Sequence, residues 1–307
     1  MIIVKAPCRI PLAGGGTDLP AFYERGGGFW VTAAIDRYCY VAAKPRFEKQ
    51  ILLHYREVEE ANRPQLIRHR IFREALKRFD VQGHVELSSL SDLPSRSGMG
   101  GSGAFTVALT HALSIYTRRA VENLAEEAIS IETGAGGVTG KQDQYAAMLG
   151  GVRRYIVNTR GVVTSETLKV NELQGHLVLF YTGVMRDAAD SLVKVGQSRE
   201  LENTLEIAYR SYAALERGDY HAYGELLNEH WAAKKRMLGD AFDKIHRLGI
   251  RIGAVGGKLL GAGGGGFFMF YVDNLEARGQ LVKAMEGHGY PLQPFRFAGE
   301  GSKVVEI

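Results

Sequence analysis

The feature that most constrains this chain is a glycine-rich segment joined directly to an apolar run. Four glycines occupy residues 98–103, and the run from Ala104 to Tyr116 is almost wholly apolar. Such a run predicts a buried helix, closed here by residues 117–119. A glycine loop that feeds a helix N-terminus can bind an anion, because unpaired N–H groups and the helix dipole point at the same place. The segment therefore predicts a phosphate site, or else a tight turn that uses glycine for steric reasons alone.

Two common phosphate-binding motifs do not match this segment. A Walker loop ends in Gly-Lys-Ser/Thr, whereas Ser102 is followed by Gly103. A dinucleotide-binding fingerprint follows a strand directly, whereas residues 88–97 are polar and include Pro94. We therefore expect a nucleotide phosphate to be held in a third way.

A second glycine loop, near the N-terminus, carries a hydroxyl and a carboxylate. Residues 14–16 are all glycine, and Thr17 and Asp18 follow them. Two interpretations of the carboxylate are open. Asp18 either caps a short helix over residues 21–25 or accepts hydrogen bonds from a polyol substrate.

Two further carboxylates lie on predicted helices. Glu132 falls in line with Leu124 and Ala128 on one face of a helix predicted over residues 121–133. It either reaches solvent from the helix end or has a partner such as a metal ion. Asp143 lies in the first turn of the next helix, where the dipole favours its ionised form. That position can serve helix stability alone or the chemistry of a site.

The densest glycine segment comes late in the chain and completes the argument for phosphate chemistry. Seven of the eleven residues in 256–266 are glycine, and an apolar strand is predicted directly after them. Ordering so much glycine costs entropy, which indicates that the backbone approaches another group closely. Phosphoryl transfer needs a phosphate cradle, a metal ion that neutralises charge and a group that orients or deprotonates the acceptor hydroxyl. One serine and one glutamate suffice for Mg²⁺ beside nucleotide phosphates, so kinase chemistry is the leading interpretation.

Composition limits the other classes. The chain has 307 residues and a net charge of +4, too dispersed to predict nucleic-acid binding. Cys8 and Cys39 are the only cysteines, which fits a reducing cytoplasm and gives no disulfide framework. No apolar run reaches membrane-spanning length, and no signal peptide is visible. We expect a cytoplasmic protein with small-molecule partners and no membrane or nucleic-acid partner; the sequence leaves open whether it forms a homodimer.

The periodicity of the remaining segments predicts a mixed α and β chain. Strands are expected over residues 1–10, 29–32, 38–41, 83–90, 176–182, 267–272 and 294–297, with a break at residues 36–37, and residues 152–157 and 162–170 are expected to form a hairpin. Helices are expected over residues 65–79, 104–116, 121–133, 141–149 and 274–286. A long helical region is expected over residues 187–248, with interruptions near Gly218 and Gly239.

Three motifs, in order along the whole chain, resemble those of the GHMP small-molecule kinases, which include galactokinase, homoserine kinase, mevalonate kinase and phosphomevalonate kinase. They are Ala6–Ile10 with Thr17 and Asp18, Pro94–Ala104, and Lys258–Gly266. Within that superfamily the sequence is most similar to the D-glycero-D-manno-heptose 7-phosphate kinases. The segments that carry this closer resemblance are 14–20, 34–38, 140–147, 229–235 and 256–266.

The resemblance implies an α+β fold of two domains with the active site in the cleft between them. Residues 1–172 would form an N-terminal domain like the second domain of ribosomal protein S5. Residues 173–307 would form a ferredoxin-like α+β domain. The cofactors implied are ATP and Mg²⁺.

The resemblance also assigns roles to individual residues. Asp143 would orient or deprotonate the acceptor hydroxyl, and Arg9 would stabilise the transferring phosphoryl group. Ser102 and Glu132 would hold magnesium; the eleven-residue interval from Glu132 to Asp143 is close to that of the family. The nucleotide phosphates would contact Ser97, Gly98, Met99, Gly100, Gly101, Ser102 and Gly103, and the substrate would contact Gly16, Thr17, Asp18, Lys141, Arg186, Gly263 and Gly264.

The loop departs from the family at one point. The family commonly has two serines and then two alanines where this chain has Gly101-Ser102-Gly103-Ala104, so one hydroxyl contact to phosphate is missing. The reaction implied is ATP-dependent phosphorylation of the anomeric hydroxyl of D-glycero-D-manno-heptose 7-phosphate to the 1,7-bisphosphate. A second phosphate on the acceptor requires cations. The candidates are Arg186, Lys141, Lys234, Lys235 and Lys258, and Arg186, after a predicted strand end, is the favoured one. The alternatives are a kinase for a fucose, galactose or mannose type of sugar and a non-catalytic sugar or nucleotide sensor.

Overall fold

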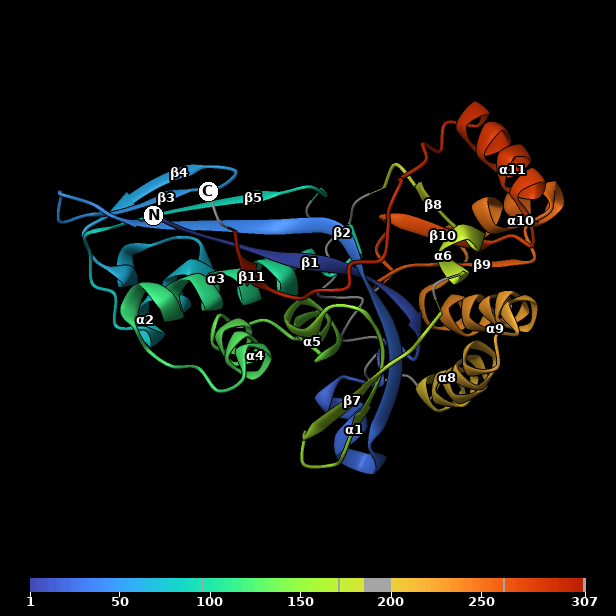
Figure 1. Ribbon diagram of the computed structural model, residues 1–307, viewed down its shortest axis with the longest axis horizontal. Helices are drawn as coiled ribbons and strands as arrows, with labels where there is room; N and C mark the ends of the chain where they lie inside the picture. The colour runs from blue at the N-terminus through green and yellow to red at the C-terminus, as the bar shows by residue number, and fades with distance from the viewer. Residues whose placement is uncertain (95–96, 171, 185–199, 262, 306–307) are drawn as a thin grey trace.

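The computed structural model of the protein describes residues 1–94, 97–170, 172–184, 200–261 and 263–305 (Figure 1). Two β-sheets, each covered by helices, divide the molecule, and the chain ends where it begins, at the larger sheet. The predicted α+β class is confirmed. Within the described residues, no helix is both long enough and apolar enough to cross a membrane.

The larger sheet is built on two long antiparallel strands, β1 (Ile2–Ala13) and β2 (Gly28–Pro45). Alternate residues of β1 from Val4 to Leu12 are fully buried, and from Ala6 to Ala13 the residues between them are buried as well, so both faces of the strand are covered there. β2 pairs with one neighbour over its first part and another over its second. The other strands are β3 (Ile51–His54), β4 (Val58–Ala61), β5 (Val85–Ser91), β6 (Val152–Val157), β7 (Val163–Thr167) and β11 (Lys303–Val304), in the order β11-β1-β2-β5-β3-β4, with β6 on β2 and β7 on β6.

One face of this sheet carries the helices that support the glycine-rich segment (Figure 1). The central one is α3 (Gly101–Thr117), which begins after Gly100 in the left-handed region and ends at Arg118, also left-handed. Most of its side chains are buried, as the apolar run predicts. Its neighbours are α2 (Arg70–Arg78), α4 (Leu124–Gly134) and α5 (Gln142–Leu149); α1 (Pro20–Gly26) and the 3-10 helix η1 (Pro64–Leu66) lie in connections.

The smaller sheet has the order β8-β10-β9, all antiparallel, from β8 (Leu177–Tyr181), β9 (Gly256–Leu259) and β10 (Phe267–Tyr271). The backbone of residues 291–293 runs along the free edge of β8. The Tyr181 N–H donates to the Pro291 carbonyl at 2.9 Å, and the Gln293 N–H donates to the Leu179 carbonyl at 2.8 Å. The helices on this side are α6 (Leu173–His176), α8 (Glu200–Glu216), α9 (Tyr220–Leu238), α10 (Asp243–Ile252) and α11 (Leu275–Gly287).

Two sequence predictions about strands are wrong for the same reason. β2 continues through Asp36 and Arg37, where a break is predicted, and residues 294–297 form no named strand. Residues 294–296 supply hydrogen-bond partners to the polar residues of β2. The Asp36 N–H donates to the Arg296 carbonyl at 2.9 Å, and the Arg37 side chain donates to the Pro294 carbonyl at 2.6 Å. This long-range contact leaves only an isolated bridge between Ile35 and Phe297.

Candidate active site

A cavity of about 730 Å³ lies between the two sheets, and the glycine loops meet there. Its wall combines residues far apart in the sequence, which only the fold brings together. The N-terminal half contributes Arg9, Pro11, Gly15, Gly16, Asp18, Ser97, Gly98, Gly100, Gly101, Ser102, Glu132, Gln142 and Asp143, and the C-terminal half contributes Thr204, His230, Lys234, Met237, Lys258, Leu259 and Gly261.

The glycine segment before α3 is held by backbone on both sides. On one side, the Arg9 N–H donates to the Met99 carbonyl at 3.0 Å, and Met99 is fully buried. On the other side, Gly98 packs directly against Gly261: a Cβ placed on Gly261 would lie 2.4 Å from the Gly98 Cα. Gly98 and Gly100 both have positive φ, near 74°, which glycine adopts without strain. The predicted close backbone approach therefore includes a contact between two glycine loops.

Arg9 and Asp143 form an ion pair at the mouth of this loop. Arg9 Nε lies 2.8 Å and Nη2 lies 2.6 Å from Asp143 Oδ1, while Nη1 donates to the Gly98 carbonyl at 2.7 Å. Arg9 is nearly buried, whereas the Asp143 side chain is 31% exposed toward the cavity. The guanidinium thus fixes one carboxylate oxygen and leaves the other free to accept a hydrogen bond from a ligand.

Asp18 caps a helix, but not the one predicted. Helix α1 begins after Leu19, and among the described residues no side chain caps it. Instead Asp18 Oδ2 accepts from the N–H groups of Lys141 and Gln142 at 2.9 and 3.0 Å, at the start of α5. Burial raises the pKa of the Asp18 carboxyl, and these backbone donors oppose the rise. Asp18 also lines the cavity, so it positions the helix that carries Asp143 and can still face a substrate.

Glu132 and Ser102 are neighbours, linked through Thr106. The Thr106 hydroxyl lies 2.8 Å from Glu132 Oε1 and 2.9 Å from the Ser102 carbonyl oxygen. Burial is the largest cause that raises the pKa of the Glu132 carboxyl, and the charge of Asp143 adds to it. Glu132 has no cationic partner among the described residues, whose His, Cys, Asp and Glu side chains also form no three-residue metal cluster. One carboxylate and one hydroxyl fit a hard cation that takes its other ligands from phosphate and water.

Basic side chains form the wall of the cavity on the side of the smaller sheet. Lys258 donates to the Leu12 carbonyl at 2.7 Å, and Lys234 donates to the carbonyls of Leu259, at 2.9 Å, and Gly261. Burial lowers the pKa of Lys234 to about 7, and Arg9 contributes. Burial, followed by the charge of Lys234, lowers the pKa of Lys258 well below its usual range.

Four residues predicted to contact substrate lie elsewhere, and one falls outside the described residues. Thr17 is fully buried behind its loop, with its hydroxyl 2.8 Å from the carbonyls of Gly14 and Phe29. Lys141 points away from the cavity to Glu126, at 2.6 Å. Gly263 and Gly264 do not line the cavity, and Arg186 lies outside the described residues.

Sequence reasoning missed two groups of cavity residues. His230 on α9 is buried in the wall, where desolvation and then Lys258 lower its pKa well below the usual value. His69, Arg70 and Ile71, at the start of α2, also line the cavity. His230 lies in one of the segments that carry the family resemblance, which was a usable signal. The residues at α2 carry no such signal.

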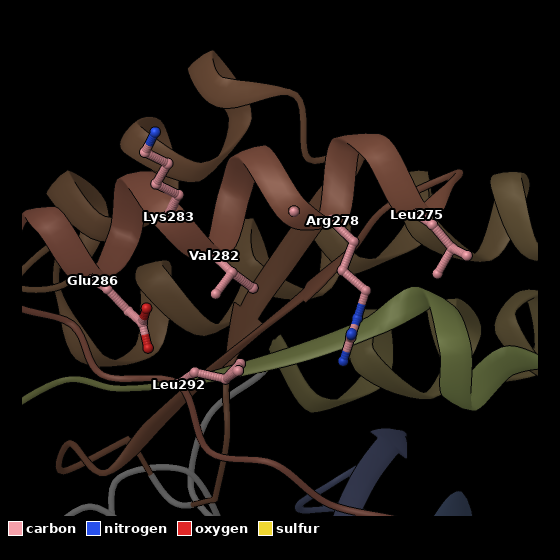
Figure 2. A pocket seen from close by; sticks show the side chains of 7 residues that line it. Leu275, Arg278, Val282, Lys283, Glu286 and Leu292 are labelled. Atoms are coloured by element: carbon pink, nitrogen blue, oxygen red, sulfur yellow. The ribbon is translucent and has the colours of Figure 1, made fainter.

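The molecule has a second hollow, of about 390 Å³, on the side of α11 that faces Leu292 (Figure 2). It is lined by Leu275, Arg278, Gly279, Val282, Lys283 and Glu286 of the helix and by Leu292. It contains no glycine loop and none of the predicted site residues.

The site has the parts of a small-molecule kinase: a backbone loop for phosphates, a carboxylate held by an arginine, and a buried carboxylate beside a serine. Family models for the GHMP kinases N terminal domain and the GHMP kinases C terminal match residues 66–151 and 211–291. The chain therefore belongs to the GHMP kinase family, whose members use ATP.

Individual relatives agree with this assignment. The chain is 31% identical to a D-glycero-alpha-D-manno-heptose 7-phosphate kinase of Campylobacter jejuni, with 100% of this chain and 99% of the relative covered. A putative sugar kinase of Campylobacter jejuni is 28% identical, with a TM-score of 0.78 and coverage of 100% and 98%. The fold also matches a D-glycero-D-manno-heptose 1-phosphate kinase of Bacteriodes thetaiotaomicron, with a TM-score of 0.84, 24% identity and coverage of 100% and 99%. The predicted sugar kinase of the GHMP fold is confirmed.

Proposed function

We propose that the protein transfers the γ-phosphoryl group of ATP to the anomeric hydroxyl of D-glycero-D-manno-heptose 7-phosphate, giving the 1,7-bisphosphate. The full-length similarity to the Campylobacter jejuni heptose 7-phosphate kinase carries this choice of substrate. The chemistry is supported by the lining of the cavity, which includes a glycine loop, the Asp143 carboxylate and the Arg9 guanidinium bonded to it.

In this proposal Asp143 acts on the acceptor. Its free carboxylate oxygen accepts the hydrogen bond of the anomeric hydroxyl and orients or deprotonates it. Arg9, already bonded to the other oxygen, faces the Gly98 carbonyl and so lies between acceptor and phosphate loop. There its charge stabilises the transferring phosphoryl group. Asp18 and Gly16, at the cavity wall, contact the sugar.

The nucleotide lies along residues 97–103, with its phosphates at the N-terminus of α3. The N–H groups of the first turn are free of side-chain caps, so they can donate to phosphate oxygens. Ser102 and Glu132 hold magnesium, which neutralises phosphate charge when it is bound. Thr106 keeps the Glu132 carboxylate in place through its 2.8 Å hydrogen bond.

The test is phosphorylation of D-glycero-D-manno-heptose 7-phosphate with ATP and Mg²⁺, beside heptose, mannose, fucose and galactose. Phosphorus NMR of the product should show a new anomeric phosphate on the heptose 7-phosphate alone. The Asp143→Asn variant is the control that ties turnover to this site. Preferential turnover of an unphosphorylated sugar would contradict the proposed substrate, and turnover of none with ATP bound would contradict the proposed activity.

A further inference from the structure

Two lysine side chains in the cavity wall have no carboxylate partner among the described residues. Lys258 is 6% exposed, and in the part of the chain that the structure describes its Nζ donates to the Leu12 carbonyl alone. Lys234 reaches the carbonyls of Leu259 and Gly261. An ammonium has three N–H donors, so each lysine keeps at least one that these carbonyls do not use. The two side chains line the same cavity.

Keeping these two lysines protonated costs free energy in the empty protein. A buried charge is stable only when it is paired, and these two lysines have only carbonyl dipoles as partners. Arg9 and His230 face the same space, and the charges of Arg9, Lys234 and Lys258 act on one another. Asp143, an acid of the same cavity, is already paired with Arg9. The bonds to carbonyls could be made by neutral amides, so holding the backbone does not account for two cations.

The position of Lys258 indicates which anion these groups receive. The phosphates of the nucleotide have their own loop at residues 97–103. Lys258 is bonded instead to Leu12, the end of β1 that leads into the loop of Gly15, Gly16 and Asp18. That loop belongs to the sugar side of the cavity.

We propose that Lys234 and Lys258, with His230 beside them, form a second anion subsite that binds the phosphate monoester carried by the acceptor. This inference rests on the proposed function, since it explains how the site selects a phosphorylated sugar. The phosphate dianion of the substrate supplies the negative charge that no carboxylate of the described residues gives to these lysines. Arg186, favoured from the sequence, is not needed for it.

The test compares Lys258→Gln and Lys234→Gln with Lys244→Gln, an exposed lysine on α10 outside the cavity. Glutamine keeps a donor for the carbonyls and removes the charge. Lys258→Gln should raise the KM for heptose 7-phosphate tenfold or more, with the KM for ATP and for unphosphorylated heptose within twofold of wild type. Lys234→Gln should also raise the KM for heptose 7-phosphate tenfold or more, with a smaller rise in the KM for ATP, because Lys234 also bonds to Gly261, which packs against Gly98 of the nucleotide loop. The control should match wild type. A parallel rise in the KM for ATP, or equal loss with both sugars, would overturn the proposal.

A binding measurement keeps the inference testable without turnover. Calorimetry of sodium sulfate binding at pH 7.5, in two buffers of different ionisation enthalpy, measures proton uptake. A bound anion favours the protonated form of Lys234 and Lys258, so the wild type should take up protons when sulfate binds. The other titratable groups of the cavity near these lysines are Arg9, His230 and Asp143. Sulfate does not change its own protonation state near pH 7.5. Lys258→Gln should weaken the binding at least tenfold. If the wild type phosphorylates only unphosphorylated sugars, the proposed function is wrong. If the wild type and the Lys258→Gln variant bind sulfate equally well, the proposed subsite is wrong, whatever the kinase substrate is.

Discussion

The two hollows of this molecule differ in how their polar groups are supported. In the cavity between the sheets, charged side chains are buried and fixed by partners from other segments, as Arg9 is by Asp143 and Gly98. In the hollow on α11, the lining comes from one helix and Leu292, and Leu275 is 77% exposed (Figure 2). A depression alone does not make a site. Chemistry requires polar groups held out of water in one geometry, as in the first hollow. In the second hollow the Nε of Arg278 is buried, but no hydrogen-bond partner among the described residues holds it.

The largest expected effect tests the cavity at its reacting centre. Asp143→Asn removes the charge that accepts the acceptor proton or orients the hydroxyl, and kcat should fall by about 10²–10⁴. The dissociation constant for ATP should stay within threefold, because the phosphate loop is unchanged. Steady-state kinetics and calorimetry measure the two quantities. Turnover near that of wild type would remove Asp143 from the centre of the site.

The next effect tests how tightly the cavity wall is packed. A Cβ on Gly103 would lie 2.5 Å from the Asp143 Cβ, so Gly103→Ala must displace α5 or α3. Unfolding in urea should show a loss of about 1–3 kcal/mol. Gly101→Ala is the matched control: among the described residues no atom outside its own turn of helix lies within 4 Å of a Cβ placed there, so the free energy of unfolding should stay within about 0.5 kcal/mol of wild type. Equal effects at both positions would contradict the close contact.

A smaller effect is the pH dependence of stability that the buried lysine causes. The pKa of Lys234 is about 7 in the folded protein and 10.5 ordinarily, so between these values the unfolded chain binds a proton that the folded one lacks. The free energy of unfolding therefore rises with pH across this window, and the penalty of burial is fully present below pH 7. Lys234→Met removes that dependence. Its stability relative to wild type should be greatest at pH 6.5 and should decline by pH 9.5 in urea titrations; a constant difference would contradict the shifted pKa.

The smallest effect belongs to the second hollow. Lys283→Ala and Glu286→Ala change charged residues on α11, far from every group that the reaction uses. Both kcat and KM should stay within twofold of wild type, and the free energy of unfolding within about 0.5 kcal/mol. A tenfold change in either kinetic constant would break the distinction between the two hollows.

The parts of the fold that were predictable from sequence are those that depend on neighbours in the chain. The loop before α3, its buried helix and the strand after residue 266 follow from glycine content and apolar period. The continuity of β2 did not follow, because its polar residues are satisfied by residues 294–296, far along the chain. The same holds for Asp18, whose sequence neighbours indicate a cap on α1 while its partners lie at α5.

The site was predictable to a similar extent. Arg9, Glu132 and Asp143 follow from the motifs, and the structure brings them to one cavity. Lys141 and Thr17 also lie in those motifs, but the direction of a side chain depends on packing that the sequence does not display. Lys234 and Lys258 were two of several available cations. Only their burial without a carboxylate partner among the described residues separates them from exposed lysines.

The contact between Gly98 and Gly261 limits how the gene for this protein can change. Each glycine fills the space into which a side chain of the other would grow, since a Cβ on Gly98 would lie 2.9 Å from the Leu260 carbonyl and one on Gly261 would lie 2.4 Å from the Gly98 Cα. A larger residue at either position cannot be accommodated by a smaller residue on the facing loop, because the residue there is already glycine. A side chain at either position therefore requires the backbone of the opposite loop to move.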